Sequence, residues 1–566
     1  MRAPGKLVPV VLLVLALVGC TNMPPPPLVT TPPSKPPPTK PAKTSEVVIG
    51  VDGITGGYNP HTVADQSAVT TALGALLLPS VFRPAADGTP QMDRTLMRSA
   101  TVTKYQPYTV TYELRGDASW SDGPPIAAED FLYLWEQMRR APGVIDSAGY
   151  RLIDNITARD AGKVVEVTFD KPYPGWRSLF NGLLPAHLLK DAPGGWDAAL
   201  EDGFPATGGP FAVSRLDQER GEIQLERNER YWEQPAALEK VVFRRADQVG
   251  VVDALRRGND QLALLRTDSV GLSLLGTLGN TVAVHTVPRS ATATVLLRPV
   301  GEDMSDARVR RAISALLDRD ALVATGTRGG PGSTLRAEAQ VLSPTAPGYR
   351  PTRPGGVSSG QPELAQAEAA LQQAGYTRGA GIWMRDGRPL SLVIAAPAER
   401  ESYVSMAREL QRQLVNAGIQ AKVETPSADQ LFTESLASVP TGQRTTGAVH
   451  LAVVPRPVGG DPATVLASNF GCLQGESAVA GAQPTNPVGF CDASVQPTIE
   501  AALSGAVPVA ETLTTIEPVL WREALTVPLF QEADSLAVRP ELTGVDVGRA
   551  PSGPFDTAVA WRRAPN

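Results

Sequence analysis

The chain has 566 residues, enough for roughly three or four domains of ordinary size. Its composition is that of a globular protein, with 42% hydrophobic and 19% charged residues and a formal net charge of -6. This acidic balance excludes a general nucleic-acid binder, which needs a basic face to displace counterions. It also argues against direct electrostatic docking onto an anionic membrane.

The first twenty residues have the pattern of a bacterial lipoprotein signal. Arg2 and Lys6 precede an apolar run from Leu7 to Val18, which is too short to span a bilayer. The small residues directly before Cys20 resemble a lipobox, so cleavage after residues 1–19 would leave Cys20 as the lipid attachment site. An ordinary signal peptide with a chance cysteine is the alternative. We expect a protein anchored by lipid at the extracytoplasmic face of the cell membrane.

Residues 20–44 are predicted to be a lipid-bearing tether. Ten of the residues from 21 to 44 are prolines. Such a segment prefers polyproline II conformation and cannot fold a core. The arrangement predicts an anchor, a stalk and then a large soluble body.

The body has the patterns of a mixed α/β fold. Alternating apolar and polar residues predict strands at 110–114, 165–169 and 223–225. Helical spacing predicts helices after a cap at Asp306, from Pro362 to Gly375 with Leu364 on the buried face, and from Tyr403 to Leu414. The last helix is followed by Gly418 and a predicted strand at 419–423. Helix, glycine and strand in this order are typical of an α/β unit.

Cys472 and Cys491 are the two cysteines outside the signal. In an oxidising compartment an isolated pair usually forms a disulfide. A metal site is the competing interpretation, but the histidines that could complete it are scattered at His61, His187, His285 and His450. We therefore expect a disulfide, no metal and no other cofactor.

One motif raises the question of catalysis. Gly356 to Gly360 match the Gly-x-Ser-x-Gly pattern around Ser358, which requires a strand-turn-helix elbow. Prolines precede and follow the motif and no apolar strand leads into it, so a flexible loop is expected instead. Gly329 to Gly332 lack the Lys-Ser/Thr of a phosphate-binding loop. The sequence therefore offers no motif for an enzyme, and we expect none.

Six motifs in a fixed order together resemble the extracytoplasmic solute-binding proteins of peptide-type ABC importers, solute-binding family 5. They are Gly57 to Pro60, the block from Tyr108 to Ile126, Ala128 to Phe131, Thr207 to Phe211, Arg227 to Trp232, and Val309 to Arg319. The resemblance spans about residues 46–545. It implies a two-lobed, class II periplasmic-binding-protein-like fold with a ligand in the interlobe cleft, and a monomer.

The same resemblance implies where the lobes divide. Lobe I would comprise residues 45–290, with an inserted subdomain at about 60–205. Lobe II would comprise residues 291–532, and residues 533–566 would return to lobe I. A chain that crosses twice between lobes can close around a ligand.

Further segments resemble a branch of this family in mycobacteria that is linked to cell-wall glycolipids. They are Leu78 to Pro84, Pro172 to Arg177, Leu184 to His187, and Pro193 to Gly195. This likeness implies binding of a phosphatidylinositol mannoside (monoacyl phosphatidylinositol tetramannoside). It equally fits control of that lipid's access to membrane mannosyltransferases in lipomannan and lipoarabinomannan synthesis. The alternative is the substrate-binding lipoprotein of an ABC importer for peptides or another small solute, with a permease as partner.

One departure from the family bears on the ligand. Peptide-binding members carry Trp and the ammonium-binding Asp where this chain has Pro455 and Val458. A buried ammonium without a counter-charge is costly, so a free peptide is disfavoured, although Asp461 could substitute. Arg456 in the same stretch would suit an anionic group such as phosphate. A solvated loop charge is the alternative interpretation of Arg456.

Aromatic rings can stack on the apolar face of a sugar. Tyr58 with its neighbour Asn59, Trp176 and Trp383 are the candidates for the cleft, and burial in the core is the alternative for each aromatic. Trp120, Tyr231 and Trp232 lie in family scaffold motifs and are expected in the core.

Overall fold

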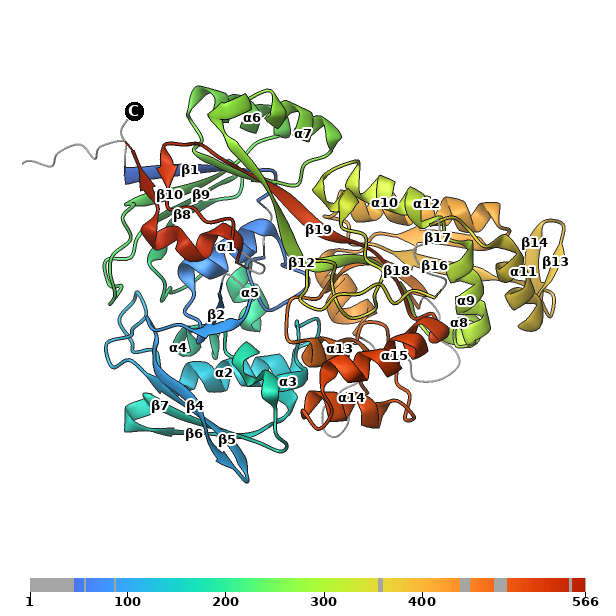
Figure 1. Ribbon diagram of the computed structural model, residues 1–566, viewed down its shortest axis with the longest axis horizontal. Helices are drawn as coiled ribbons and strands as arrows, with labels where there is room; N and C mark the ends of the chain where they lie inside the picture. Colours follow the sequence, from blue (N-terminus) through green and yellow to red (C-terminus); the bar gives the residue numbers. More distant parts are fainter. Residues whose placement is uncertain are drawn as a thin grey trace, which may run out of the picture. The chain divides into compact units, whose positions relative to one another are not determined.

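A ten-stranded sheet runs through the computed structural model (Figure 1). Residues 45–54, 57–85, 88–354, 360–437, 448–472, 486–548 and 552–564 are described. They all belong to the unit Lys43–Asn566. The predicted signal, Cys20 and the tether therefore lie outside the described residues, as do Gly356 to Ser359 of the Gly-x-Ser-x-Gly motif.

The large sheet mixes parallel and antiparallel neighbours. In spatial order its strands are β17 (Gln420–Glu424), β16 (Ser391–Ala395), β18 (Leu451–Pro457), β12 (Ala283–Leu297), β19 (Thr526–Val538), β11 (Leu262–Leu265), β1 (Glu46–Val51), β10 (Lys240–Arg245), β9 (Glu222–Arg227) and β8 (Phe211–Asp217). Strands distant in sequence lie side by side, so many crossover connections are needed.

Two long antiparallel strands, β12 and β19, connect the halves of this sheet. The first part of β12 pairs with residues 533–538 of β19, and its last part, 291–297, pairs with β18. The end of β19 pairs with β11. The register of β12 against β19 shifts between Pro288 and Thr292, as at a β-bulge. The predicted lobe boundaries at 290/291 and 532/533 fall within these two strands, and the division into lobes stays a prediction.

Helices pack on both halves of the sheet. Beside the β1 half lie α1 (Ala68–Leu77), α6 (Gln248–Arg257) and α7 (Ser269–Gly276). Beside the β16 half lie α8 (Gly301–Met304), α9 (Ala307–Leu316), α10 (Arg319–Thr327), α11 (Leu364–Gln373) and α12 (Glu401–Asn416), with a small sheet of β13 (Thr377–Gly379), β14 (Ile382–Arg385) and β15 (Arg388–Pro389). Each half has its own apolar cluster, around Val241 and Leu410 respectively.

A second sheet has four strands, all from residues 97–169. Its strand order is β4 (Met97–Tyr105), β5 (Tyr108–Leu114), β7 (Val164–Phe169) and β6 (Ile153–Arg159). Residues 82–201 also form the strand pair β2 (Phe82–Pro84) and β3 (Pro90–Met92). The same segment forms the helices α2 (Ala128–Arg140), α3 (Ala148–Arg151), α4 (Ala186–Leu189) and α5 (Gly195–Glu201). The core of this second sheet is continuous with that of α13 (Pro462–Phe470), α14 (Gln496–Leu503) and α15 (Val509–Glu523). Trp120 is fully buried in this core, as predicted.

The predicted elements are largely confirmed. The three predicted strands are β5, β7 and β9, and the strand at 419–423 is β17. Asp306 caps α9, because its carboxylate accepts the amide N–H of Arg308 (2.8 Å). The prediction for α11 was wrong at Leu364, which is 64% exposed. Leu364 is the first residue of that helix, and only later positions such as Leu371 reach the core.

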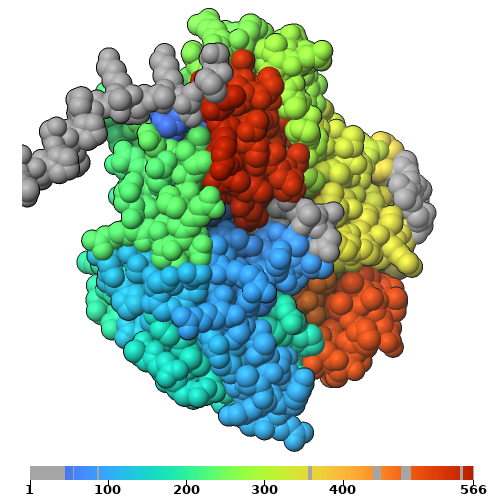
Figure 2. Space-filling model, turned by 60° about the vertical axis from the view of Figure 1, so that its left-hand side comes forward, coloured from blue at the N-terminus to red at the C-terminus, as the bar shows by residue number. Residues whose placement is uncertain are grey.

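The C-terminal residues pack against the β1 half of the sheet. Strands β20 (Leu542–Thr543) and β21 (Arg562–Arg563) pair with each other. The ring of Phe555 lies 5.9 Å from that of Phe243 on β10. Figure 2 shows this segment, in red, beside residues coloured green and above residues coloured blue.

Candidate functional site

The stretch that departs from the peptide-binding pattern lies mostly on a strand. Arg456 pairs with Thr292 of β12, and Pro455 and Pro457 flank it on β18. The other neighbour of β18, β16, pairs only with Leu451 and Ala452, so the prolines stand at a free edge, where a missing N–H does no harm. The expectation that Arg456 lies in a loop was wrong, because β12 extends far enough to pair with it.

Arg456 is a buried cation with unused donors. Its side chain is 1% exposed, and its Nε and Nη1 atoms have no hydrogen-bond partner among the described residues. The guanidinium lies 5.8 Å from the ring centre of Phe470. Burial lowers the pKa of Arg456 to about 10, against a smaller opposite effect of Glu517. The alternative of a solvated surface charge is therefore wrong.

A small cavity of about 40 Å³ adjoins this guanidinium, and we call it the Arg456 cavity. Most of its lining is apolar, and its polar side chains are those of Arg456, Asp146, Ser468 and Asn469. The lining comes from both sides of the predicted lobe boundary: Val63 and 143–146 on one side, and Leu296, Phe432, Leu436, Ala437, 454–457, 468–469 and Pro487 on the other. An apolar pocket with a few polar groups is the usual form of a small-ligand site.

Asp146 faces the same cavity and was missed by the sequence analysis. Its backbone is left-handed, with φ of 52°, a conformation that Asp tolerates better than most residues. Within the described chain its carboxylate has no hydrogen bond and no ion pair. Burial and the charge of Asp461 raise the pKa of Asp146 to about 7. No sequence motif marks this residue.

Asp461 caps α13, and its role as a substitute for the missing ammonium-binding carboxylate at Val458 stays a prediction. Its Oδ2 atom accepts the amide N–H of Thr464 (3.0 Å) and lies 2.9 Å from the Thr464 hydroxyl. Val458 is 7% exposed, and its amide N–H donates to the carbonyl oxygen of Ser290 (3.0 Å). Gly460 fits here because a Cβ at that position would lie 2.2 Å from the carboxylate of Asp146.

A second small cavity, of about 50 Å³, is also lined by Pro455, and we call it the Arg289 cavity. Its lining comes from β12 and β19 and from segments near residues 66–71 and 552–555. In contrast to the Arg456 cavity, it holds several charged side chains: Arg289, Arg400, Glu532 and Asp534. Pro455 is common to the linings of both cavities.

The aromatic candidates are buried in apolar clusters. Tyr58 is 1% exposed, and its hydroxyl has no partner among the described residues; burial raises its pKa to about 12. Trp176 packs edge-on to Phe82, and the indole N–H of Trp383 donates to the carbonyl of Ala417 (3.0 Å). None of these rings lines the two cavities described here.

Asn59 is fully buried next to Tyr58. Its Oδ1 accepts the amide N–H of His61 (3.0 Å), and its backbone N–H donates to Oδ2 of Asp65 (2.9 Å). These bonds fix the turn after Gly57. Asn59 does not line either cavity, and its predicted role in binding stays a prediction.

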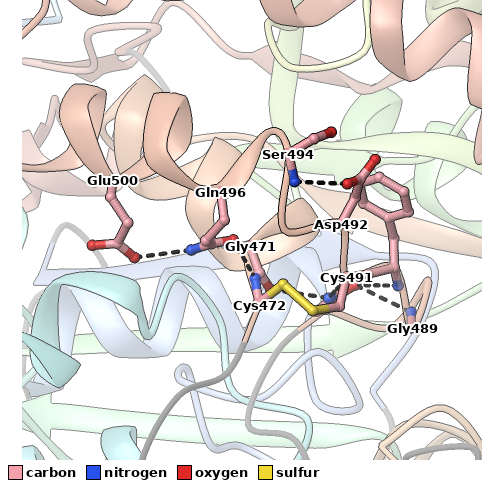
Figure 3. Close-up of a disulfide and its surroundings, with 10 residues drawn as sticks. Gly471, Cys472, Gly489, Cys491, Asp492, Ser494, Gln496 and Glu500 are labelled. Atoms are coloured by element: carbon pink, nitrogen blue, oxygen red, sulfur yellow. Dashed lines mark hydrogen bonds between the residues drawn. A yellow bond between two sulfur atoms is a disulfide. The ribbon is translucent and has the colours of Figure 1, made fainter.

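The predicted disulfide is present (Figure 3). The Cα atoms of Cys472 and Cys491 are 4.8 Å apart. The amide N–H of Cys472 donates to Oε1 of Gln496 on α14 (2.7 Å). Nε2 of Gln496 donates in turn to Oε1 of Glu500 (3.0 Å). The bridge thus fixes the chain that leaves α13 next to α14.

No group of three or more His, Cys, Asp or Glu in the described ranges could hold a metal ion. No described helix is long and apolar enough to cross a membrane.

Comparison with known proteins agrees with this architecture. The chain is 35% identical to the probable monoacyl phosphatidylinositol tetramannoside-binding protein LpqW of Mycobacterium tuberculosis, over 98% of this chain and 97% of that protein. It is 25% identical to the oligopeptide-binding protein OppA of Mycobacterium bovis, over 86% of this chain and 79% of that protein. These relatives are binding proteins.

Solved structures confirm the two-lobed α/β solute-binding fold. The periplasmic EDTA-binding protein EppA superposes with a TM-score of 0.72 at 24% identity, covering 93% of this chain and 98% of its own. The oligopeptide-binding protein AppA from Bacillus subtilis, in complex with a nonapeptide, superposes with a TM-score of 0.71 at 17% identity, covering 92% and 100%. A model of the family matches residues 102–453. The chain belongs to the bacterial extracellular solute-binding proteins, family 5.

Proposed function

We propose that this chain is a lipid-anchored, extracytoplasmic binding protein for a phosphatidylinositol mannoside. The observation that carries the proposal is its likeness to LpqW, which extends over almost the whole of both chains. Cys20 would hold the anchor. The bound lipid would be presented to, or withheld from, membrane mannosyltransferases of lipomannan and lipoarabinomannan synthesis. Binding requires no chemistry on the ligand.

The Arg456 cavity supports a ligand that is both anionic and apolar. A phosphodiester would accept hydrogen bonds from the Nε and Nη1 atoms of Arg456, which are unused and desolvated. An acyl chain would contact Val63, Leu296 and Phe432 in the same cavity. Each methylene removed from water contributes roughly 0.8 kcal/mol.

A second candidate function is that of a receptor delivering a solute to an ABC importer. The likeness to OppA and the unpaired carboxylate of Asp146 favour it, because this carboxylate could take the place of the missing ammonium partner at Val458. A peptide ammonium would then pair with Asp146, and its carboxyl end with Arg456.

Native mass spectrometry of the whole lipoprotein distinguishes the two functions. The protein would be extracted in mild detergent from an actinobacterial host and examined for retained ligands. A retained mass equal to a phosphatidylinositol mannoside supports the main proposal. A series of short peptides contradicts it and favours the importer receptor.

The variant Arg456→Gln tests the role assigned to the guanidinium, with Arg456→Lys as the control that keeps the charge. We expect the Gln variant to retain at most about one tenth of the lipid, because a hydrogen bond to a charged group contributes roughly 1.5–3 kcal/mol. The Lys variant should retain more than the Gln variant. Equal retention by all three proteins contradicts the role of Arg456.

A further inference from the structure

The Arg289 cavity is lined by polar groups whose hydrogen-bonding capacity is not used. The guanidinium of Arg289 is 3.6 Å from Glu532 and 3.8 Å from Asp534, beyond hydrogen-bond length, and it donates no hydrogen bond within the described chain. Its side chain is nevertheless only 15% exposed. The Arg289 guanidinium therefore makes two long ion pairs in a sheltered space, and its N–H groups make no hydrogen bond to a described residue.

Some hydrogen-bond acceptors in this cavity are also without a donor among the described residues. Oε1 of Glu532 accepts from Arg266 (3.0 Å) and from the hydroxyl of Tyr403 (2.8 Å), whereas Oε2 has only the distant Arg289. Asp534 accepts no hydrogen bond from any described residue, although its side chain is 4% exposed. The buried hydroxyl of Ser290 also lacks a partner among the described residues.

The charges around the cavity are balanced. The cationic groups are Arg266, Arg289 and Arg400, and the anionic groups are Asp52, Glu532 and Asp534. Arg400 is already engaged, because its Nη2 donates to the carbonyl oxygens of Val63, Ala64 and Gln66. A balanced site gives no net attraction to an ion, so it favours a neutral ligand that donates and accepts at once.

Adjacent hydroxyl groups of a sugar have this property. One hydroxyl can donate to a carboxylate oxygen while its neighbour accepts from a guanidinium, and each unused group then gains a partner. We propose that the Arg289 cavity is a sugar subsite, in which Asp534 and Oε2 of Glu532 accept from, and Arg289 donates to, vicinal hydroxyls of a mannose residue. The proposal rests on the proposed function and divides its ligand into two parts: sugar in the Arg289 cavity, and phosphate and acyl chain in the Arg456 cavity beyond Pro455.

The variant Asp534→Asn tests the subsite, since it keeps the size of the side chain and removes the charged acceptor. The probe is a soluble mannotetraose without lipid or phosphate, titrated into the full lipoprotein in detergent by calorimetry. We expect the wild type to bind mannotetraose and the variant to bind it at least roughly tenfold more weakly. Asp217→Asn, which removes a carboxylate paired with Arg215 on the distant strand β8, is the matched control and should bind like the wild type.

A second variant, Arg289→Gln, covers the case in which Asp534→Asn does not fold, and it should weaken the same binding. Equal mannotetraose affinity in the wild type and in a folded variant overturns the sugar subsite. Failure of the wild type to bind mannotetraose overturns it as well. Circular dichroism at matched concentration identifies the folded proteins.

A parallel titration with mixed micelles containing a phosphatidylinositol mannoside separates this inference from the proposed function. If the lipid binds and Asp534→Asn leaves its affinity unchanged, the sugar subsite fails and the proposed function stands. If mannotetraose binds in a manner dependent on Asp534 but the lipid does not bind, the subsite stands and the proposed function fails. If neither binds, both fail.

Discussion

The hydroxyl groups of Tyr173 and Thr464 lie 2.7 Å apart in a buried contact between residues 291 positions apart in the chain. The Thr464 hydroxyl also lies 2.9 Å from Oδ2 of Asp461, to which it can donate. Thr464 therefore links the part of the chain that carries the second sheet to the N-terminus of α13, beside the Arg456 cavity.

Thr464→Val should destabilise the protein more than Tyr173→Phe. The first change removes the hydroxyl contacts to both Tyr173 and Asp461 (2.7 and 2.9 Å). The second removes the contact to Thr464 and a longer one to Ser178 (3.3 Å), and it leaves Thr464 bonded to Asp461. We expect losses of about 2 and about 1 kcal/mol in the free energy of unfolding. Urea denaturation of both variants measures the difference, and equal losses would show that the Asp461 contact contributes no more than the longer Ser178 contact.

Arg456→Met should make the ligand-free protein more stable and deprive it of its anionic ligand. A buried guanidinium whose Nε and Nη1 make no hydrogen bond to a described residue costs desolvation energy that a methionine of similar length does not. We expect a gain of roughly 1–4 kcal/mol, measured by urea unfolding of protein stripped of lipid. A loss of stability would mean that the guanidinium has partners in the ligand-free state.

Asp146 should make the protein less stable as the pH rises from about 4 to 7. Burial raises its folded pKa to about 7, above the usual unfolded value of about 4, so the unfolded chain releases this proton first. The stabilisation is thus full below about pH 4 and is lost by about pH 7. Asp146→Asn keeps a side chain suited to the left-handed backbone. The difference in unfolding free energy between wild type and variant, measured at pH 4 to 8, should change in this interval and be constant above it.

Loss of the disulfide should cost about 3 kcal/mol. Cys472 and Cys491 are 19 positions apart, and closure of a loop of this size restricts the unfolded chain by about that amount. The double variant Cys472→Ser, Cys491→Ser should unfold at lower urea concentration than the wild type. Addition of a reductant should lower the wild-type midpoint to that of the variant and leave the variant unchanged.

The sequence was most informative where local chemistry decides the structure. Alternation identified β5, β7 and β9, and the Asp306 cap identified the start of α9, because each depends on neighbouring residues only. The predicted burial of Leu364 was wrong, because burial at a helix end depends on how far the helix extends past its neighbours. Arg456 was placed in a loop because the resemblance aligns this stretch with the family's segment between a strand and a helix, whereas its pairing with β12 makes it part of a strand.

The polar groups of the candidate site were the hardest to predict. Asp146 follows no motif and reaches the Arg456 cavity through the arrangement of distant segments. Glu532 and Asp534 offered a signal, since two charges two positions apart in a strand lie on one face, and β19 is otherwise rich in apolar residues. Two carboxylates on one face of a buried strand require partners, and Arg289 supplies one from β12.

The shift in register between Pro288 and Thr292 places the Arg289 cavity on the ribbon that joins the two halves of the large sheet. Arg289 and Ser290 lie within that irregular segment, and Glu532 and Asp534 lie on the strand beside it. Any swing of one half against the other must bend or twist this ribbon. A molecule held there would contact both strands of this ribbon, so its binding would change how easily the ribbon bends.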